Sequence, residues 1–253
     1  MRLYIFLIAL CLCSCSTNKQ IQYINDASSY IKAPISYSKY TIQPYDILKI
    51  DVHSSNLEAA LPYNKPGAFN NRVANATLQS LQLEGYLVSN EYTIDFPILG
   101  LISVEGKTIK NLEQDIKTKL ISEKHLLDPL INIRLLNACF TVLGEVKNPG
   151  TFLFVEDRIS VLQALGFAGD VTVEGLKKDI CIIREVDKKR SIHKLDLTKT
   201  SSLNEDVFYI KPNDIIIVPQ NYKKVKSAGF LGDSQSISSL TSILLSLALL
   251  ITN

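Results

Sequence analysis

The sequence predicts an α+β protein with two small folded units in the middle of the chain and an apolar segment at each end. Three observations lead to this prediction. Short apolar runs alternate with a two-residue period, as half-buried strands do. One amphipathic stretch in each half has helical spacing and follows a residue suited to a helix N-cap. The 253 residues, 46% of them hydrophobic, are enough for one or two modest domains with real cores.

The first fifteen residues, MRLYIFLIALCLCSC, place one cation before an apolar run that ends in small residues and cysteine. This layout is typical of a secretory signal peptide and is too short to span a membrane. The stretch Leu12 to Cys15 resembles the lipobox of bacterial lipoproteins. The resemblance implies that Cys15 becomes the lipid-bearing first residue and that Ser16 suits sorting to the outer membrane. The alternative is an ordinary signal peptide that happens to contain cysteines.

Charge and cysteine content restrict the function further. Cleavage before Cys15 removes Arg2 and lowers the formal charge from +2 to +1. A charge near zero argues against a nucleic-acid partner, which needs a basic face. Cys139 and Cys181 both lie in apolar, strand-like runs. A disulfide in an oxidising compartment and two buried thiols are the two interpretations.

Residues 16–37 are polar without a clear period, and we interpret them as a tether. The first folded unit is predicted over residues 38–137. Its opening strand alternates Leu48, Ile50 and Val52 with polar residues, directly after a turn at Pro44-Tyr45-Asp46.

The rest of the first unit is predicted as follows. Residues 56–83 are Asn-rich and form a long surface excursion. The stretch from Glu91 to Gly106 restores alternation, with Ile94, Phe96 and Ile98 on one side and Pro97 at an edge or bulge. Thr108 then caps a helix with the apolar stripe Ile109, Leu112, Ile116 and Leu120, and the strand LINIRLL ends the unit near Leu136.

The second unit is predicted over residues 138–220. Two apolar runs flank Asn148-Pro149-Gly150, a strong hairpin signal. Ser160 and Gln163 have the spacing of a capping box, and Gly166 and Gly169 are expected to end the short helix early. Two more hairpins are expected, around 187–190 and 211–214. Strands crossed by one short helix suggest a compact unit of the β-grasp kind.

Four blocks in order carry a resemblance to a known family. They are YTIQPYDILKIDV, GYLVSNEYTIDFPILGLISVEGKT, FTVLGEVKNPGTF and ISVLQALGFAGDVT, and they cover most of Tyr40 to Gln220. The chain resembles outer-membrane polysaccharide export lipoproteins of the Wza type, with a small mixed α/β export domain followed by a β-grasp (SLBB-like) domain. It departs from the family pattern at Tyr45, where the family has glycine, and at Ser89 and Glu91.

The resemblance implies a ring of subunits in the outer membrane through which a capsular polysaccharide or exopolysaccharide chain leaves the cell. It also implies outer-membrane lipid and an inner-membrane polysaccharide co-polymerase as partners, with the bulk of the chain in the periplasm. The residues that match the family motifs are expected to be structural. They are Pro44, Asp46, Gly85, Pro97, Gly100, Gly144, Pro149, Gly150 and Gly169.

The chain ends in an apolar segment, within residues 221–253, in which Ser234, Ser238, Ser242 and Ser246 recur at every fourth position. On a helix these serines form one stripe. Residues 234–251 would make roughly 27 Å of helix, just enough to cross a thin bilayer. Three alternatives stay open: a stripe that lines a watery pore, a stripe that packs against neighbouring helices, and a plain anchor.

Two rival functions compete with a channel. A lipoprotein could bind glycan or scaffold a secretion complex without forming a pore. A glycan-cleaving enzyme would need two positioned carboxylates, and the sequence offers no motif for such a pair. His53, His125 and His193 are scattered, and no metal-binding spacing, GxSxG elbow or phosphate loop occurs. We therefore expect no catalytic residues, no metal and no cofactor.

Overall fold

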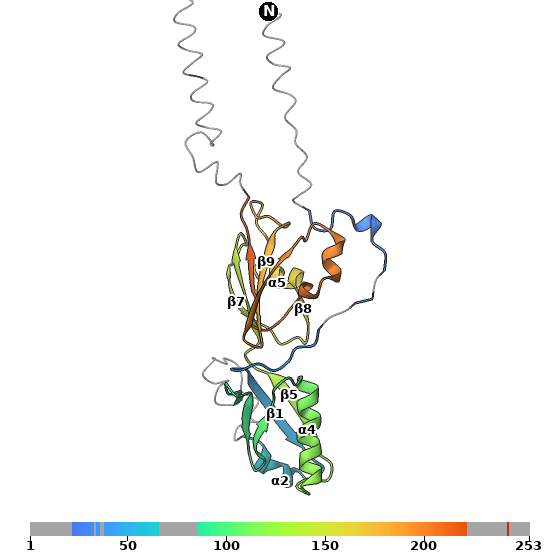
Figure 1. The fold of residues 1–253 in the computed structure, drawn as a ribbon, viewed down its shortest axis with the longest axis vertical. Helices are drawn as coiled ribbons and strands as arrows, with labels where there is room; N and C mark the ends of the chain where they lie inside the picture. Colours follow the sequence, from blue (N-terminus) through green and yellow to red (C-terminus); the bar gives the residue numbers. More distant parts are fainter. Residues whose placement is uncertain (1–21, 33, 36–37, 66–84, 222–241, 243–253) are drawn as a thin grey trace, which may run out of the picture.

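The structure is a computed structural model, and it describes residues 22–32, 34–35, 38–65 and 85–221, together with Ser242. These residues form two units, the first over 38–65 and 85–137 and the second over 138–221. Figure 1 shows the two units one above the other along the long axis of the molecule. The α+β class predicted from the sequence is confirmed for this part of the chain.

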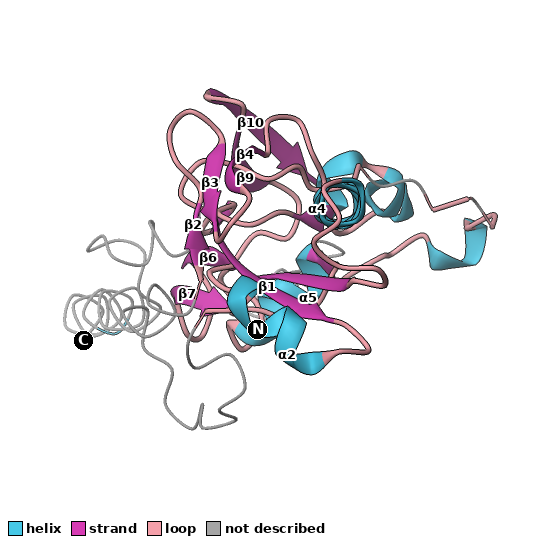
Figure 2. Ribbon diagram, turned by 90° about the horizontal axis from the view of Figure 1, so that it is seen from below, coloured by secondary structure: helices cyan, strands magenta, loops and turns pink. Residues whose placement is uncertain are grey.

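The first unit contains two small antiparallel sheets and one long helix. Its elements are β1 (Ile47–His53), α2 (Leu57–Ala60), η3 (Leu61–Tyr63), β2 (Tyr86–Leu87), β3 (Thr93–Phe96), β4 (Gly100–Ser103), α4 (Ile109–Ser122) and β5 (Leu130–Leu135). The strand order is β2-β1-β5 in one sheet, and β3 pairs with β4 in the other. The helical turn α2 lies at the end remote from the second unit (Figures 1 and 2).

The alternation in the first strand is confirmed and explains the position of the core. Leu48, Ile50 and Val52 are buried, whereas the residues between them are partly exposed. β1 pairs with β5 along its length, from Leu48 opposite Leu135 to His53 opposite Leu130. A strand with one buried face fixes its register, because a shift by one residue would expose every apolar side chain.

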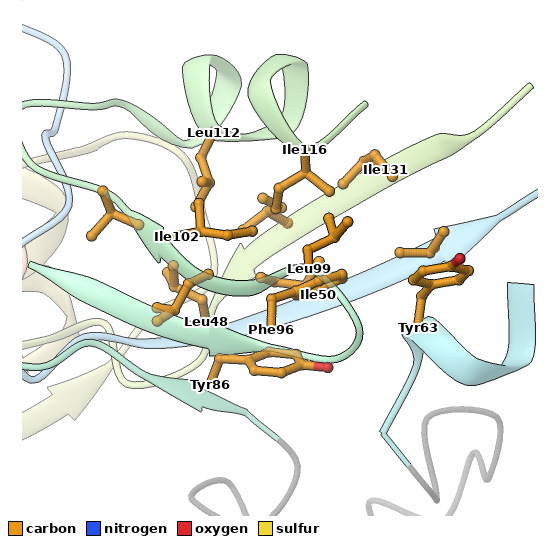
Figure 3. Close-up of a cluster of buried hydrophobic side chains, with 14 of the residues drawn as sticks. Leu48, Ile50, Tyr63, Tyr86, Phe96, Leu99, Ile102, Leu112, Ile116 and Ile131 are labelled. Atoms are coloured by element: carbon orange, nitrogen blue, oxygen red, sulfur yellow. The ribbon is translucent and has the colours of Figure 1, made fainter. Parts of the chain in front are cut away.

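The predicted helix is α4, and its start and its apolar stripe are confirmed. The Thr108 side chain accepts a hydrogen bond from the backbone N–H of Asn111, as an N-cap residue does. Leu112, Ile116 and Leu120 are fully buried. Figure 3 shows Leu112 and Ile116 pointing from the helix toward the sheets. Each such side chain contributes about 1.5–3 kcal/mol when it leaves water.

Two details of the first unit differ from the prediction. Residues 57–64 are not a surface excursion, because Ala60, Tyr63 and Asn64 are buried and the Asn64 side chain bonds both the N–H and the carbonyl of Val52. Ile98 is not on the inner side of a strand. It lies in the turn between β3 and β4 with φ +67 and is 59% exposed. The rest of the predicted excursion, 66–83, lies outside the described residues.

The second unit is built on one mixed sheet. Its elements are β6 (Cys139–Gly144), β7 (Gly150–Leu153), β8 (Ile159–Ser160), α5 (Val161–Phe167), β9 (Ile180–Val186), β10 (Lys189–Leu195), η4 (Thr200–Asn204), η5 (Asp206–Phe208), β11 (Tyr209–Ile210) and β12 (Ile215–Val218). The five-stranded sheet has the order β10-β9-β12-β6-β7, and β12 runs parallel to β6. The helix α5 follows the first hairpin.

The helix α5 begins as the sequence predicts and ends just before Gly169, whereas Gly166, which was also expected to end it, lies inside the helix. The Ser160 side chain accepts from the N–H of Gln163, and the Gln163 side chain accepts from the N–H of Ser160, which completes the capping box. At the other end Gly169 has φ +76, and the N–H of Asp170 bonds the carbonyl of Leu165. This is the Schellman arrangement, which favours glycine at the left-handed position.

One of the two later hairpins is confirmed and one is wrong. β9 and β10 pair directly around Asp187 and Lys188, both with positive φ, as in a type I′ turn. β11 and β12 do not pair with each other. β11 pairs with β8, and β12 lies between β6 and β9. The turn that joins them, closed by the N–H of Asp214 on the carbonyl of Lys211, therefore connects two sheets.

The segment before the first unit is attached to the second unit, which the tether interpretation did not foresee. The backbone N–H groups of Ile24 and Asn25 bond the carbonyls of Leu197 and Thr198. A short turn, η2 (Ala27–Ser29), follows. Figure 1 shows the chain then running along the second unit toward the first. Among the described residues no helix is both long enough and apolar enough for a membrane span.

Candidate functional site

The family motif Pro44-Tyr45-Asp46 forms a tight turn where the two units meet. The N–H of Asp46 bonds the carbonyl of Gln43 at 3.2 Å, which closes a four-residue turn. Tyr45, the third residue, has φ +70, as in a type II turn. Pro44 suits the second position because its φ is fixed. The turn predicted from the sequence is confirmed, and Tyr45 occupies the place for which glycine is best suited.

The Asp46 carboxylate is the centre of this turn and is 1% exposed. It accepts hydrogen bonds from the hydroxyl of Tyr40 at 2.8 Å and from the N–H of Gln43 at 2.9 Å. Burial raises the pKa of Asp46 to about 6, although the two hydrogen bonds act in the opposite direction. Burial, and next the charge of Asp46, raise the pKa of Tyr40 above its ordinary value.

Side-chain amides hold the turn on both sides, and one of them, that of Gln43, joins the two units. The Gln43 side chain donates to Oδ1 of Asp187 at 3.3 Å and accepts from the N–H of Asp187 at 3.0 Å. Asn137 accepts from the N–H of Ile47 at 2.8 Å and donates to the carbonyl of Tyr45 at 3.0 Å. Leu135 packs against the cores of both units. We therefore name this turn, residues 43–46 with their hydrogen-bond partners, the joint between the two units.

The other family-motif residues lie at turns and close contacts of the backbone. Gly85 precedes β2, and its carbonyl accepts from Lys65. Pro97 and Gly100 flank the turn between β3 and β4, and Pro149 and Gly150 lie at the end of the β6–β7 hairpin. These positions fit the structural role expected of them.

Gly144 and Gly169 are the two motif glycines whose surroundings leave no room for a side chain. A Cβ on Gly144 would lie 2.0 Å from the carbonyl oxygen of Val218, and its φ is +90. A Cβ on Gly169 would lie 2.8 Å from Nδ2 of Asn148. The first close contact lets β6 and β12 run side by side, and the second lets the β6–β7 turn pack on the end of α5.

A buried ion pair close to the joint was not foreseen from the sequence. Arg184 of β9 donates from Nη2 to Oδ2 of Asp214 at 2.6 Å and from Nε to Oδ1 at 2.9 Å. Nη2 also donates to the carbonyl of Tyr209, and the N–H of Lys211 donates to Asp214. Arg184 interrupts an apolar strand, DICIIREV, and this interruption was the only available signal.

Both described ends of the main chain meet at one loop, residues 170–177. Tyr23 donates to Oδ1 of Asp170 at 2.5 Å, and the ammonium of Lys177 lies 4.7 Å from the centre of the Tyr23 ring. At the other end, the N–H of Asn221 bonds the carbonyl of Glu174. Figure 1 shows this end of the second unit to be the one remote from the first unit. The first and last residues of the main described chain, Gln22 and Asn221, therefore lie at one end of the second unit.

Several predicted site residues cannot be placed. Cys15 lies outside the described residues, and so do the predicted signal peptide, Ser234, Ser238 and Ser246. Of the predicted C-terminal helix after Asn221, only Ser242 is described, and it is exposed. The two cysteines within the described units, Cys139 and Cys181, are both free and half-buried, so the thiol interpretation holds. The described residues contain no cluster of acidic, Cys and His side chains suited to a metal ion.

Comparisons with known proteins match part of this chain. Residues 35–136 match the model of the family described as polysaccharide biosynthesis/export protein. The EPS I polysaccharide export outer membrane protein EpsA of Ralstonia solanacearum is 34% identical over 92 residues. The protein of the same name from Ralstonia nicotianae is 32% identical over 92 residues. Each match covers 35% of this chain and 24% of the relative, so the chain spans about a quarter of the length of these curated relatives.

The matched range corresponds to a structural unit. It begins shortly before Tyr40, includes the Pro44–Asp46 turn and ends just after β5. The printed names place both relatives in the outer membrane, in agreement with the location expected from the sequence. Over this range the resemblance noted in the sequence is confirmed, because residues 35–136 match the model of the polysaccharide biosynthesis/export family.

Proposed function

We propose that the chain is a subunit of an outer-membrane channel that exports a capsular polysaccharide or exopolysaccharide from the periplasm to the cell surface. The observation that carries this proposal is the match of residues 35–136 to the export family, together with the names of the two relatives. Transport needs a path and a selective wall, and it needs no bond to be broken. The chain accordingly acts as a passive conduit and not as an enzyme.

The second unit is proposed to be the SLBB-like β-grasp domain of such a protein. Its first and last strands, β6 and β12, lie parallel at the middle of the sheet, and α5 follows the first hairpin. This topology supports the β-grasp assignment. The Gln43 side chain, through its hydrogen bonds with Asp187, connects this domain to the first unit in the proposed channel wall.

The positions of the chain ends support attachment to one membrane. Cys15 is proposed to carry the lipid, and residues 234–251 are proposed to cross the outer membrane. Six residues separate Cys15 from Gln22, and twelve separate Asn221 from Ser234, which extended chain bridges over at most ~25 Å and ~45 Å. Because both ends leave from the loop 170–177, lipid and helix can enter the same bilayer, with the first unit deep in the periplasm.

The serine stripe is proposed to face the lumen of a ring of such helices. Hydroxyl groups donate and accept hydrogen bonds, as sugar hydroxyls do, and carry no charge that would trap an anionic polymer. A transport path needs contacts weak enough to release its cargo. An inner-membrane polysaccharide co-polymerase and the synthesis machinery would supply the driving force.

The test compares three forms of the chain in cells that make the polysaccharide. Deletion of residues 234–253 should leave a folded periplasmic protein and abolish surface polysaccharide, measured by immunolabelling of whole cells. Cys15→Ser should release the protein from the membrane fraction and remove fatty-acid labelling. Normal surface polysaccharide with the truncated chain would contradict the channel and favour a glycan-binding or scaffolding lipoprotein.

A further inference from the structure

The joint places a buried carboxylate next to the residue that links the two units. From the first unit, the Gln43 side chain accepts from the N–H of Asp187 at 3.0 Å and donates to its Oδ1 at 3.3 Å. The backbone N–H of the same Gln43 donates to Oδ2 of Asp46 at 2.9 Å. The residue that reaches across to the second unit is therefore held in position by the Asp46 carboxylate.

Asp46 has no cation as a partner among the described residues, unlike the other buried carboxylate of this region. Asp214 is also 1% exposed, but it is paired with Arg184. Asp46 takes part in none of the ion pairs of the described chain. Its hydrogen bonds come from two neutral groups, the hydroxyl of Tyr40 and the N–H of Gln43. Burial without a counter-charge disfavours the ionised form of a carboxyl group.

Further charged and titratable groups surround the joint, and the Tyr40 hydroxyl connects them to Asp46. They are Cys139, Arg184, Asp187, Asp206, Lys211 and Asp214 of the second unit and Tyr92 of the first. Burial and next the charge of Asp46 raise the pKa of Tyr40 most. Asp214 and Cys139 raise it further. Tyr40 therefore lies where the two units meet, and separation of the units would bring water to it and to Asp46.

We propose that the joint is a pH-dependent hinge, which stays closed when the Asp46 carboxyl is protonated and opens more readily when it is ionised. In the closed joint the carboxylate is buried without a cation, whereas in the open joint it is hydrated, so ionisation favours opening. Opening moves the two units apart while each keeps its own fold. This inference concerns the two units of one chain, and it holds whether or not the chain forms a channel.

The sign and the size of the effect follow from proton binding. Burial raises the pKa of Asp46 to about 6 in the closed joint, and hydration returns it toward 3.8 in the open joint. The closed joint thus binds the proton more tightly, so it is favoured at low pH and loses this advantage as the pH rises through 6. From pH 5 to pH 7.5 the ratio of open to closed joints should rise by up to about tenfold.

Hydrogen exchange at Asp187 measures the joint directly. Its N–H lies in the turn between β9 and β10 and is protected by Gln43 of the other unit, so it exchanges when the joint opens. The full-length chain in detergent is exchanged at pH 5 and at pH 7.5, and the peptide that contains Asp187 is followed by mass spectrometry. Asp46→Asn is exchanged in parallel, because it cannot titrate and has the same intrinsic exchange rate at Asp187 at each pH.

The expected result is a change in the ratio of the two exchange rates. Exchange at Asp187 in the wild type, divided by that in Asp46→Asn, should rise by up to about tenfold from pH 5 to pH 7.5. Peptides from α4, in the core of the first unit, should keep a constant ratio, because the unit stays folded. A ratio at Asp187 that is the same at both pH values would overturn the hinge.

Two further variants keep the test decisive if Asp46→Asn misfolds. Tyr40→Phe retains the titratable carboxyl but removes one hydrogen bond to its ionised form, so the pH profile of exchange at Asp187 should move to higher pH. Gln43→Ala removes the link between the units and should exchange rapidly at Asp187 at both pH values. A profile of Tyr40→Phe at the wild-type pH would contradict the role of Asp46.

A distance between the units separates opening of the hinge from local movement of the turn. Spin labels at Leu101→Cys in β4 and Ile192→Cys in β10, at positions 72% and 66% exposed, are placed in a chain with Cys139→Ser and Cys181→Ser. The labelled chain is diluted with unlabelled chain, and distances are measured by double electron–electron resonance. The distribution should be broader at pH 7.5 than at pH 5, and Asp46→Asn should remove this difference. A distribution that does not change with pH would overturn the hinge and leave the proposed channel untouched.

Discussion

At the scale of single residues, Tyr45 is in a backbone conformation that costs free energy. Its φ of +70 lies in the left-handed region, where the Cβ of an L-residue is crowded. The side chain is 62% exposed, so little packing offsets this cost. The turn persists because its neighbours hold it, through Asn137 on the carbonyl of Tyr45 and through Asp46 on the N–H of Gln43.

Replacing Tyr45 with glycine should therefore stabilise the protein. The relief of strain exceeds the extra freedom that glycine gains in the unfolded chain, and we expect the free energy of unfolding to rise by about 0.5–1 kcal/mol. Urea unfolding of the chain in detergent measures it. Tyr45→Ala is the matched control: it removes the same ring but keeps a Cβ, so it should bring no gain. Equal stability of the two variants would contradict the explanation by strain.

Asp46 should make stability depend on pH. Its pKa is about 6 in the folded chain because burial disfavours the carboxylate, against about 3.8 when unfolded. The folded state thus binds the proton more tightly. Protonation of Asp46 therefore stabilises the folded state at low pH, and this stabilisation is lost as the pH rises through 6. Between pH 7.5 and pH 5 the wild type should gain about 1–1.5 kcal/mol relative to Asp46→Asn, which cannot titrate. Unfolding of both proteins at the two pH values measures this; a difference that stays constant would show that Asp46 keeps an ordinary pKa.

At the scale of elements, the pair Arg184–Asp214 ties β9 to the turn before β12. Both side chains are more than nine-tenths buried, so removal of one partner leaves an unpaired charge in the core. Arg184→Met should lower the free energy of unfolding by about 3–5 kcal/mol, and adding Asp214→Leu should recover much of that loss. Arg190→Met is the control, because its pair with Glu185 is exposed and should contribute less than about 1 kcal/mol. Thermal unfolding of the four proteins gives these differences; similar losses for Arg184→Met and Arg190→Met would contradict the role of burial.

The elements that the sequence predicted are those with local signals. The alternation of Leu48, Ile50 and Val52, the cap at Thr108 and the capping box at Ser160 each lie within a few residues of the structure that they start. The predicted motif glycines are also local, since Gly169 ends the helix that precedes it. Such signals depend on spacing along the chain, which a single sequence contains.

The features that the sequence missed depend on partners far away in the chain. β11 pairs with β8, some fifty residues earlier, and nothing in YIKPNDIII distinguishes that from a local hairpin. The attachment of Ile24 and Asn25 to residues 197–198 uses backbone groups, which carry no side-chain pattern. The sequence predicts the turn at Asp46. It does not predict the hydrogen bond between Gln43 and Asp187, which connects this turn to the second unit across 144 positions of the chain.

At the scale of the whole molecule, the two ends of the described chain's long axis are different. The loop 170–177, which holds both chain ends, lies at one extremity, and α2 lies at the other (Figure 1). If Cys15 and the C-terminal segment both enter the outer membrane, that loop faces the bilayer and α2 points into the periplasm. Val173 in the loop is 86% exposed, and Leu127 in the first unit is 93% exposed, so the two positions offer matched probes.

A fluorophore attached at Val173→Cys should therefore be quenched by spin-labelled lipid when the protein is reconstituted in vesicles. The same fluorophore at Leu127→Cys should not be quenched, because the two units stacked along the long axis keep it away from the bilayer. Cys139→Ser and Cys181→Ser remove the competing thiols. In detergent without the quencher the two labelled proteins should be equally bright, which controls for the local surroundings of the dye. Equal quenching at both positions would mean that the molecule lies flat on the membrane, and a subunit in that orientation could not form the wall of a channel.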